Sequence, residues 1–295
     1  MASPCALVIG ESLVDVIPPD VHPGGSPMNV AIGLARLGHE TWLGTWYATD
    51  DYGQTIVRHL QASGVHVVAG SDDATRTSSA QVIFDEQGSA RYLFDLECDM
   101  PDLPPGLKPL VAHAGSLGAV LRPSGPRVLD AIGRLRGGGC VISFDPNTRP
   151  DAMGPVGQAR ALVESYVRLA HVVKASDEDI AWLYPGADPL DVARQWSGDG
   201  PSLVVLTMGA RGSHGFSGPV EVEAGPPAVT VADTVGAGDA FMSGLLHALW
   251  ISGWLGRPQL MDAPALGAAL SVATAAAGVA LSRAGADPPW LAELA

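Results

Sequence analysis

The residues best suited to chemistry form one run near the C-terminal end of the chain, Asp233-Thr234-Val235-Gly236-Ala237-Gly238-Asp239-Ala240-Phe241. The run follows an apolar, strand-like segment at 228–231 and leads into a predicted helix at 240–250. Gly236 and Gly238 let the backbone turn tightly and approach a ligand closely, and the amide groups at a helix start bind anions. A phosphate held there and an alcohol beside Asp239 would have the geometry of phosphoryl transfer, with Asp239 accepting the hydroxyl proton.

Two other interpretations of this run have to be weighed. Asp239 could simply cap the helix, with the glycines serving only a turn. The run could also be a dinucleotide-binding Gly-x-Gly-x-x-Gly motif, but Phe241 occupies the third glycine position and the run lies far from the first strand of the chain. The residues alone therefore leave a phosphoryl-transfer site and a helix cap open, and they disfavour a dinucleotide site.

The charge of the chain excludes several classes of partner. Its 295 residues include 31 acidic and 17 basic side chains, which gives a net charge of −14. Because such a chain repels polyanions, we expect no nucleic acid and no membrane as partners. The two lysines, Lys108 and Lys174, are not followed by Ser or Thr, which excludes a Walker A phosphate loop.

The cysteines and the longest uncharged run both predict a soluble, cytoplasmic protein. Cys5, Cys98 and Cys140 are odd in number and far apart, so they predict a reducing compartment and neither a disulfide framework nor a zinc ribbon. The run at 263–282 is long enough to cross a bilayer. Because it consists mostly of Ala, Gly, Ser and Thr, we expect it to be a closely packed helix in a soluble core.

Short apolar runs alternate with helical segments along most of the chain. The expected strands are 6–9, 41–46, 65–68, 110–114, 141–144, 172–174 and 203–207, and the expected helices are 27–37, 52–62, 126–136, 157–169, 177–183 and 190–196. This alternation predicts an α/β fold with a mainly parallel central sheet and helices on both faces. We expect residues 1–295 to form a single domain.

One segment interrupts the alternation and predicts a β-hairpin. Residues 79–85 and 89–96 flank the turn Asp85-Glu86-Gln87-Gly88. A two-stranded ribbon is unstable alone, and the strand expected at 12–17 could join it in a small second sheet. The hairpin is then either an edge of the main sheet or part of a lid over a site, formed by about 12–20 and 78–98.

Four further blocks accompany the run at 233–241, in the order Gly10-Glu11-Ser12-Leu13-Val14-Asp15, Gly24-Gly25-Ser26-Pro27-Met28-Asn29-Val30-Ala31, Phe144-Asp145-Pro146-Asn147-Thr148-Arg149 and Thr207-Met208-Gly209-Ala210-Arg211-Gly212. Together the five blocks resemble the ribokinase-like carbohydrate kinases of the phosphofructokinase-B type. The resemblance covers about residues 6–289. It implies a Rossmann-like sheet with a small β-lid, ATP as the phosphoryl donor and a sugar hydroxyl as the acceptor.

The resemblance also implies roles for single residues. Asp239 resembles the catalytic base, and the loop Gly236-Ala237-Gly238 resembles the anion hole. The positions that match sugar-binding residues are Asp15, Gly25, Asn29 and Arg149, and those that match the nucleotide site are Ser176, Thr207, Gly209, Gly212, Gly236, Gly238 and Thr274. Three of these keep a plainer interpretation open, namely a solvated lid residue for Asp15, a local backbone contact for Asn29 and an ordinary surface position for Arg149.

Two departures from the family pattern bear on the metal and on the substrate. Many members carry Asn-x-x-Glu beside magnesium and the phosphates, whereas this chain has Ser176 and Asp179 at that spacing. The shorter Asp179 side chain would reach Mg²⁺ through water. The lid run Phe94-Asp95-Leu96-Glu97-Cys98-Asp99 lacks the aromatic-plus-arginine pattern of kinases of acidic keto-sugars. We therefore expect a neutral sugar, fructose or a related ketose or pentose, as in the fructokinase-like branch.

A monovalent cation and a second subunit complete the expectations. The resemblance implies K⁺ behind the anion hole, at the positions Asp233, Val235, Ala280, Arg283 and Gly285. Arg283 or water replacing the ion is the open alternative. The hairpin stripe Val82, Phe84, Tyr92 and Phe94 lacks a partner nearby in the sequence, which predicts a homodimer through the lid. The alternatives for the whole chain are a nucleoside kinase and a non-catalytic sugar-sensing relative.

Overall fold

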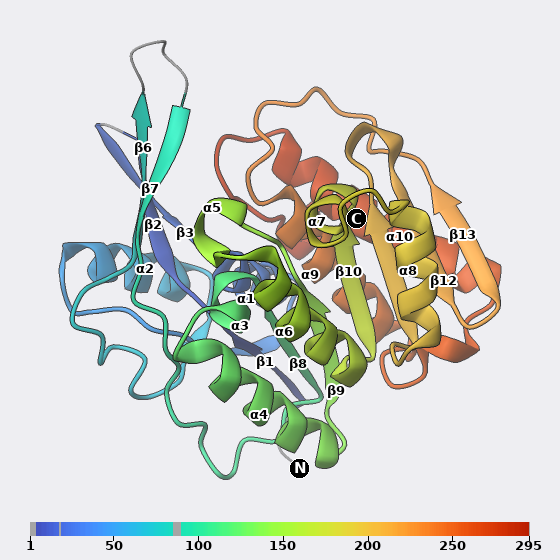
Figure 1. Ribbon diagram of the computed structural model, residues 1–295, viewed down its shortest axis with the longest axis horizontal. Coiled ribbons are helices and arrows are strands. Elements are labelled where there is room, and N and C mark those ends of the chain that lie inside the picture. Colours follow the sequence, from blue (N-terminus) through green and yellow to red (C-terminus); the bar gives the residue numbers. More distant parts are fainter. Residues whose placement is uncertain (1–3, 18, 85–89, 295) are drawn as a thin grey trace.

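The computed structural model describes residues 4–17, 19–84 and 90–294. Within these residues the strands form a nine-stranded sheet and a separate four-stranded sheet (Figure 1). The large sheet has the order β13-β12-β11-β10-β9-β8-β1-β4-β5. Its strands are β1 Cys5–Ile9, β4 Glu40–Gly44, β5 His66–Val67, β8 Val111–Gly115, β9 Val141–Asp145, β10 Val172–Ser176, β11 Leu203–Thr207, β12 Ser213–Ser217 and β13 Val220–Ala224.

The expected mainly parallel sheet is confirmed. Every pairing from β11 across to β5 is parallel, and β12 and β13 add an antiparallel edge hairpin that the apolar pattern did not predict. The expected strand at 228–231 is wrong, because this segment is irregular and Val229 and Val231 are exposed. The apolar run at 228–231 therefore has no neighbouring strand to pair with.

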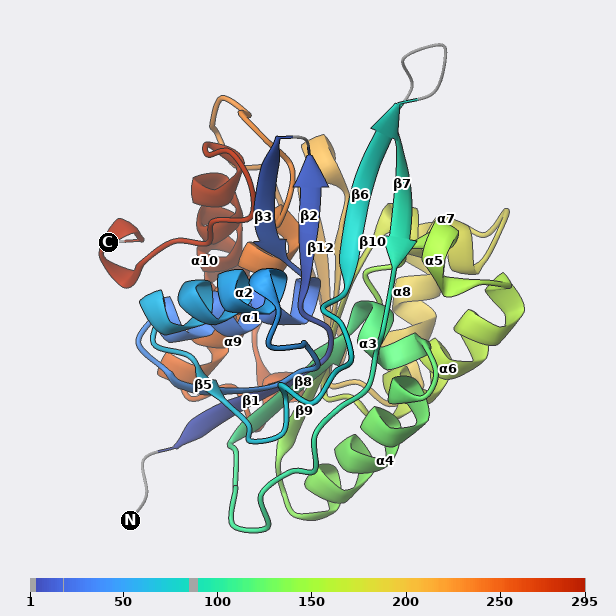
Figure 2. The same ribbon diagram turned by 90° about the vertical axis from the view of Figure 1, so that its left-hand side faces the viewer.

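Helices cover both faces of the large sheet (Figure 2). One face carries α1 Ser26–Arg36, α2 Asp51–Ala62, α9 Ala237–Ile251 and α10 Ala263–Leu281. The other carries α3 Ser116–Val120, α4 Ser124–Gly137, α6 Val156–Leu169, α7 Asp177–Leu183 and α8 Pro189–Gly198, with the short α5 Pro150–Met153 beside them. Short 3₁₀ turns occur at η1 Gly209–Arg211, η2 Pro258–Leu260 and η3 Leu291–Glu293. The two faces bury two separate apolar clusters.

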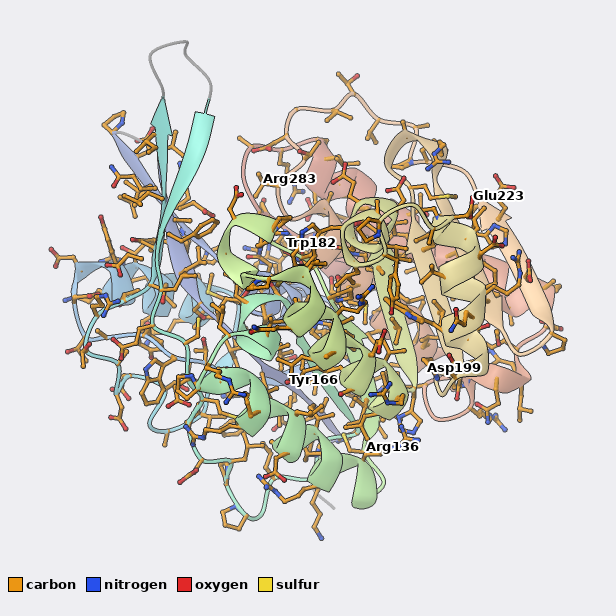
Figure 3. All side chains as sticks on the ribbon, in the orientation of Figure 1. Arg136, Tyr166, Trp182, Asp199, Glu223 and Arg283 are labelled. Atoms are coloured by element: carbon orange, nitrogen blue, oxygen red, sulfur yellow. The ribbon has the colours of Figure 1, made fainter. Side chains whose placement is uncertain are left out.

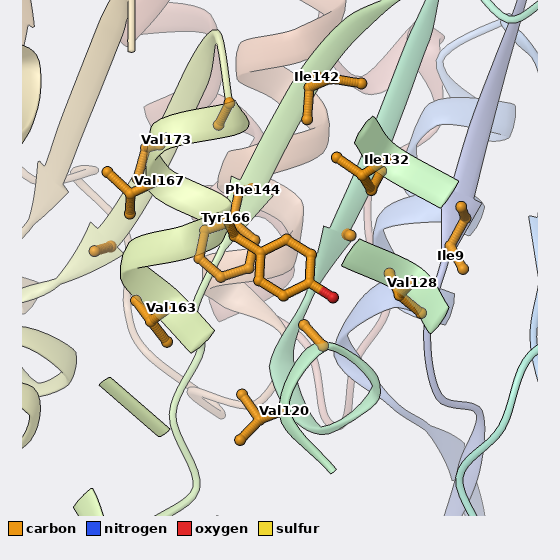
Figure 4. Close-up of a cluster of buried hydrophobic side chains, with 14 of the residues drawn as sticks. Ile9, Val120, Val128, Ile132, Ile142, Phe144, Val163, Tyr166, Val167 and Val173 are labelled. Atoms are coloured by element: carbon orange, nitrogen blue, oxygen red, sulfur yellow. The ribbon is translucent and has the colours of Figure 1, made fainter. Parts of the chain in front are cut away.

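The core beneath α4 and α6 holds the middle of the sheet in place (Figure 4). The rings of Phe144 on β9 and Tyr166 on α6 stack with centroids 4.8 Å apart. The buried Tyr166 hydroxyl donates a 2.8 Å hydrogen bond to the carbonyl of Gly125, so its polar end is satisfied inside an apolar cluster. This packing fixes β9, and the loop that follows β9 reaches the site described below.

The uncharged run at 263–282 forms α10, as expected, and packs closely in the fold. Of the described helices, α10 is the one long and apolar enough to cross a bilayer. It lies against α9, where a side-chain carbon added at Gly244 would be 2.7 Å from the methyl group of Ala276. The small residues therefore let two helices approach closely, which is the packing expected from the composition.

The smaller sheet, which we call the lid sheet, rises above the end of the large sheet (Figures 1 and 2). Its order is β3-β2-β6-β7, with β2 Leu13–Ile17, β3 Asp20–Gly24, β6 Ser79–Phe84 and β7 Ala90–Asp95. The strands β6 and β7 pair in antiparallel fashion, and the expected turn at 85–88 lies outside the described residues. An edge hairpin of the main sheet is therefore wrong, and β3 is an additional strand that was not expected.

Candidate active site

A cavity of about 660 Å³ opens where the lid sheet faces the carboxyl ends of the parallel strands. It lies beside β1 and β8, where the chain order across the sheet changes direction, which is the usual ligand position in open α/β sheets. The cavity brings together most of the residues expected for sugar, base and cation, namely Asp15, Gly25, Asn29, Arg149, Asp233, Val235, Gly236, Gly238, Asp239 and Gly285.

The glycine loop enters α9 as expected. The helix begins at Ala237, and Gly236 precedes it in a left-handed conformation with φ of 74°. A side-chain carbon at Gly236 would lie 2.7 Å from the Cβ atom of Ala286, so both the backbone conformation and the space require glycine. Asp239 lies inside the first turn and its side chain does not cap the helix. The helix-cap interpretation of Asp239 is therefore wrong.

The carboxylate of Asp239 is buried and held by three side chains. Ser26 Oγ donates to Oδ1 at 2.7 Å, Asn29 Nδ2 donates to Oδ2 at 2.8 Å and Asn147 Nδ2 lies 3.2 Å from Oδ1. Burial raises the pKa of Asp239, and this outweighs its hydrogen bonds and the nearby cations Lys174 and Arg149. The result is a buried carboxylate that is fixed in orientation and has a raised proton affinity.

The sugar-side positions converge on the same cavity. Asp15 lies on β2 facing the cavity, and burial raises its pKa against the opposing charges of Arg149 and His22. Gly25 has φ of 110°, and a side-chain carbon there would lie 2.7 Å from the carbonyl oxygen of Glu11. Asp15 is thus not simply a solvated lid residue, and Asn29 contacts Asp239 across the fold, not only its own backbone.

Arg149 and two residues with strained backbones also line the cavity. Arg149 Nη1 donates to Asn147 Oδ1 at 2.5 Å and to the carbonyl oxygen of Thr148 at 2.9 Å, and Arg149 lines the cavity. Ser116 and Asn147, with φ of 54° and 34°, are the two non-glycine residues with positive φ in the described part of the chain. Both line the cavity, and such strain concentrates at functional sites.

Of the positions expected at the nucleotide, Gly236 and Gly238 line this cavity and the other five lie outside its lining. Ser176 ends β10 and pairs with Thr207 at the end of β11. Gly209 begins η1 and Gly212 follows it, while Thr274 is half-buried on α10. These five residues thus lie at or near the carboxyl edge of the sheet and on α10, the helix that packs against α9.

Asp179 is engaged in a buried clasp. Its Oδ1 accepts from the amide and the hydroxyl of Thr148 at 2.6 and 2.9 Å, and its Oδ2 accepts from the amide and the hydroxyl of Ser176, each at 2.7 Å. A carboxylate offers about four acceptor positions, so these four bonds fill it. The geometry favours a structural role that ties β10 to the loop after β9, and the magnesium role of Asp179 stays a prediction.

The expected cation positions bracket the glycine loop. Asp233 accepts from the amides of Val235 and Gly285 at 3.0 and 2.8 Å, which joins the loop to the turn after α10. The Ala280 carbonyl accepts from the amide of Arg283. The guanidinium of Arg283, which is labelled in Figure 3, pairs with Asp287 and Glu293. This pairing gives no support to Arg283 as a replacement for the ion.

The acidic lid residues Asp95, Glu97 and Asp99 are not among the residues that line the cavity, which corrects the reason given for a neutral sugar. Glu97 accepts from Trp46 and Thr75, and Arg76 pairs with both Asp95 and Glu97. Asp99 pairs with Arg127. The carboxyl groups that line the cavity instead are those of Glu11, Asp15, Asp233 and Asp239.

The lid stripe also faces inward where it is described. Phe94 lines the cavity, whereas the side chains of Val82, Phe84 and Tyr92 lie outside the described set. The exposed apolar side chains on the opposite face of the lid sheet include Val21, Ile83 and Leu93. The homodimer through the expected stripe stays a prediction, and the outer face of the lid sheet is a second apolar surface that a partner could contact.

Sequence reasoning missed several residues of the site. Ser26 and Asn147, which hold Asp239, lie inside blocks that the resemblance had already marked. Glu11 also lies in such a block; it is buried, it accepts a 2.7 Å hydrogen bond from the amide of Gly118, and burial raises its pKa to about 7. Lys174, whose only sequence signal was its rarity, lies buried behind the glycine loop.

Comparison with known proteins agrees with this geometry. A fructokinase of Rhizobium leguminosarum bv. trifolii is 32% identical over 272 residues, which cover 86% of this chain and 82% of that protein. The structure of aminoimidazole riboside kinase from Salmonella enterica, complexed with aminoimidazole riboside and an ATP analog, matches with a TM-score of 0.81 and 27% identity over 98% of each chain. A Vibrio cholerae fructokinase double mutant, with fructose, ADP and potassium bound, matches with a TM-score of 0.81 and 27% identity, covering 96% of this chain and 94% of that one.

The family assignment rests on nearly the whole length of the chain. The model of the pfkB family carbohydrate kinases matches residues 9–292, and this range contains the glycine loop, Asp239 and the lid sheet. The expected ribokinase-like fold is confirmed by the solved neighbours. The chain therefore belongs to the pfkB family of carbohydrate kinases, which are phosphotransferases.

Proposed function

We propose that the chain transfers the terminal phosphoryl group of ATP to a hydroxyl group of a neutral sugar, fructose or a related ketose or pentose. The observation that carries the proposal is the placement of Asp239. Its buried carboxylate is oriented by Ser26, Asn29 and Asn147 in the first turn of α9, directly after the glycine loop. A proton acceptor and an anion-binding helix start thus lie side by side.

In the proposed step, Asp239 takes the proton of the acceptor hydroxyl as its oxygen bonds to the terminal phosphorus of ATP. The bond from that phosphorus to the bridging oxygen breaks, and ADP leaves with the bonding electrons. The amides of residues 236–238 stabilise the charge on the transferring group. Asp15, Gly25 and Asn29 hold the sugar hydroxyls, and Arg149 reaches the substrate or its phosphate.

The charges of the cavity support a neutral substrate. Asp15, Asp233 and Asp239 contribute carboxylates to the lining, Glu11 adds a carboxyl group whose pKa is raised to about 7, and Arg149 is the one arginine in it among the described residues. A sugar acid would add a further negative charge to this set, whereas neutral hydroxyl groups can donate to carboxylates. Fructokinases among the relatives and solved neighbours favour fructose.

The nucleotide and ion sites are assigned on the same basis. ATP would bind along Ser176, Thr207, Gly209, Gly212 and Thr274, with Mg²⁺ arriving on its phosphates. The described residues contain no cluster of three or more His, Cys, Asp or Glu that could hold a metal, which suits an ion held mainly by phosphate and water. K⁺ would lie among the carbonyl groups at Asp233, Val235, Ala280, Arg283 and Gly285, and a neighbouring fructokinase binds potassium.

A nucleoside kinase is the second candidate. The aminoimidazole riboside kinase neighbour, which binds a riboside, fits as well as the fructokinase neighbour. A non-catalytic sensor is less well supported, because it has no need of an oriented base with a raised pKa. We further propose a cytoplasmic location, in line with three free, buried cysteines, and a homodimer through the lid sheet.

A coupled assay of ADP release tests the proposal. Purified protein with Mg·ATP is screened against fructose, ribose, other neutral sugars, sugar acids and ribosides at equal concentration. The proposal expects the highest kcat/KM with a neutral ketose or pentose. A clear preference for a riboside would support the second candidate. ADP release that no acceptor stimulates would favour the sensor.

A further inference from the structure

Lys174 and Asp145 form a buried ion pair on neighbouring strands. Lys174 Nζ lies 2.8 Å from Asp145 Oδ2, and the two side chains are 4% and 0% exposed. Lys174 lies on β10 and Asp145 ends β9, and these strands pair in parallel. Lys174 is one of the two lysines in the chain, and its positively charged side chain is buried in the core.

The ammonium group lies directly behind the glycine loop. A side-chain carbon added at Gly238 would be 3.0 Å from Lys174 Nζ, which is the nearest atom to it. Gly238 does not have positive φ, so its backbone conformation alone does not require glycine. The close approach of the ammonium group gives a separate reason for glycine at this position.

Stability alone is a weak reason to keep such a pair. Removing two charges from water costs several kcal/mol per ion, and well-packed apolar residues often replace a buried pair at no cost. Burial opposes the charge on Lys174, but the nearby carboxylates Asp145, Asp179 and Asp239 outweigh it and raise the pKa of the amine. The lysine is therefore a fixed cation at neutral pH.

The other charged groups around this cation are few. Asp145 on β9 has its pKa raised to about 6 by burial, against the attraction of Lys174. His113 on β8 is buried, and burial together with Lys174 lowers its pKa to about 3, so it stays neutral. Asp179 faces the pair from α7. Asp239 is also near Lys174, and Asp239 in turn faces Arg149 and the uncharged Ser26 and Asn29 of α1.

We propose that Lys174 is a positioning residue for phosphoryl transfer, which places a fixed positive charge behind residues 236–238 and is itself held there by Asp145. The charge strengthens the anion hole, because a cation in a dry site stabilises negative charge more than one in water. It also keeps Asp239 ionised beside its other carboxylate neighbours. The inference rests on the proposed function of Asp239 and the loop.

Two variants separate this role from a structural one. Lys174→Met/Asp145→Asn removes both charges and leaves no unpaired ion, so it keeps the fold testable even if Lys174→Met alone is unstable. Asp145→Asn keeps the ammonium group and removes only its partner. Each protein is compared with wild type by thermal unfolding, and by kcat and sugar KM between pH 5 and 9.

The double variant should unfold near the wild-type temperature, with kcat lower by about tenfold or more and sugar KM within about twofold. The acidic limb of its kcat/KM profile should move to higher pH, because Asp239 loses a neighbouring cation. In Asp145→Asn the limb should move to lower pH, because Asp239 loses a neighbouring anion. Opposite movements of the limb are not expected from a general loss of packing.

Wild-type kcat and an unmoved limb in the double variant would overturn the inference. So would equal losses of kcat in both variants with unmoved limbs, because that pattern is structural. The proposed role of Asp239 as the base is tested separately, because full turnover by Asp239→Asn would contradict it. If this inference alone fails, Asp239→Asn stays inactive while the double variant keeps wild-type kinetics.

Discussion

The side-chain amide of Asn29 donates a 2.8 Å hydrogen bond to the carboxylate of Asp239 across 210 positions of sequence. The resemblance had assigned Asn29 to the sugar, and its contact with the base adds a second task. Its Oδ1 atom is buried without a hydrogen-bond partner in the described part of the chain. Because α1 carries Asn29 and α9 carries Asp239, the packing of these two helices sets the geometry of the proposed base.

The first prediction concerns Asp239. Asp239→Asn keeps the size of the side chain but cannot accept the proton, so we expect turnover to fall roughly 10²–10⁴-fold. Ser26 can reverse its hydroxyl to accept from the new amide, but that amide faces the amide donor of Asn29 or of Asn147 in either orientation. We therefore expect a modest loss in the free energy of unfolding, on the order of 1 kcal/mol. In wild type, the raised pKa of Asp239 means that kcat/KM falls as pH drops through that pKa.

Steady-state kinetics with the chemical step shown to limit turnover is the measurement. Glu178→Gln, at an exposed carboxyl of α7, is the matched control and should keep wild-type kinetics. Undiminished turnover by Asp239→Asn under these conditions would remove Asp239 as the base.

The second prediction concerns the Asp179 clasp. Asp179→Ala leaves the buried amides of Thr148 and Ser176 without their acceptor, so we expect a loss of about 1–3 kcal/mol in the free energy of unfolding. The magnesium concentration that gives half-maximal turnover should stay near the wild-type value. Chemical denaturation and a magnesium titration measure the two quantities. A clearly raised magnesium requirement would instead support the metal role expected from the sequence.

The third prediction concerns assembly through the outer face of the lid sheet. Leu93 is 56% exposed there, beside other apolar side chains. Leu93→Asp should shift a dimer toward monomer, because it places a charge in an apolar contact. Leu260→Asp, at an exposed position on η2, is the control and should leave the assembly unchanged. Sedimentation showing wild-type monomer at high concentration would contradict a homodimer.

The sequence predicted the order of elements better than the contacts between them. Apolar runs such as that of β9 and helices such as α6 are local patterns of spacing, and both occur close to where they were expected. The segment at 228–231 is also an apolar, strand-like run, but it has no neighbouring strand to pair with, so the local pattern was misleading there. An extended segment becomes a strand only when it pairs with a neighbouring strand. This pairing depends on residues outside the segment, so the segment's own sequence does not predict it.

The site shows the same limit more strongly. Asp239 and the glycine loop were found because their chemistry is contained in nine consecutive residues. The contacts of Asp239 with Ser26 and Asn147 span 213 and 92 positions. Burial raises the proton affinity of Glu11, and the pairing of β9 with β10 brings Asp145 to Lys174. Both depend on the whole fold, so no local sequence pattern predicts them.

The fourth prediction concerns Glu11. Burial raises its pKa from 4.5 to about 7 in the folded chain, so its contribution to stability is present below about pH 4.5 and is lost as pH rises through about 7. Glu11→Gln stays neutral throughout. The stability of Glu11→Gln relative to wild type should therefore increase by up to about 3 kcal/mol between pH 5 and pH 8.

Urea unfolding at several pH values gives this difference directly, with Glu178→Gln as the control for an exposed carboxyl. A difference for Glu11→Gln that stays constant with pH would mean that Glu11 is ionised in the folded chain across this range. The interpretation of Glu11 as a buried, protonated side chain would then be wrong.

The last prediction concerns the monovalent cation. Asp233 supplies a formal negative charge beside the glycine loop, and its hydrogen bonds to the amides of Val235 and Gly285 lower its pKa, so it stays ionised. The Arg283 guanidinium pairs with Asp287 and Glu293. The carboxylate of Asp233 is therefore available to a monovalent cation.

Replacing K⁺ with tetramethylammonium at constant ionic strength should lower turnover, because the larger ion cannot fit among carbonyl groups. The unfolding temperature should stay unchanged, and Na⁺ should give intermediate turnover. Turnover that does not change with the exchange would mean that water, or the hydrogen bonds of Asp233 to the amides of Val235 and Gly285, holds the loop in place.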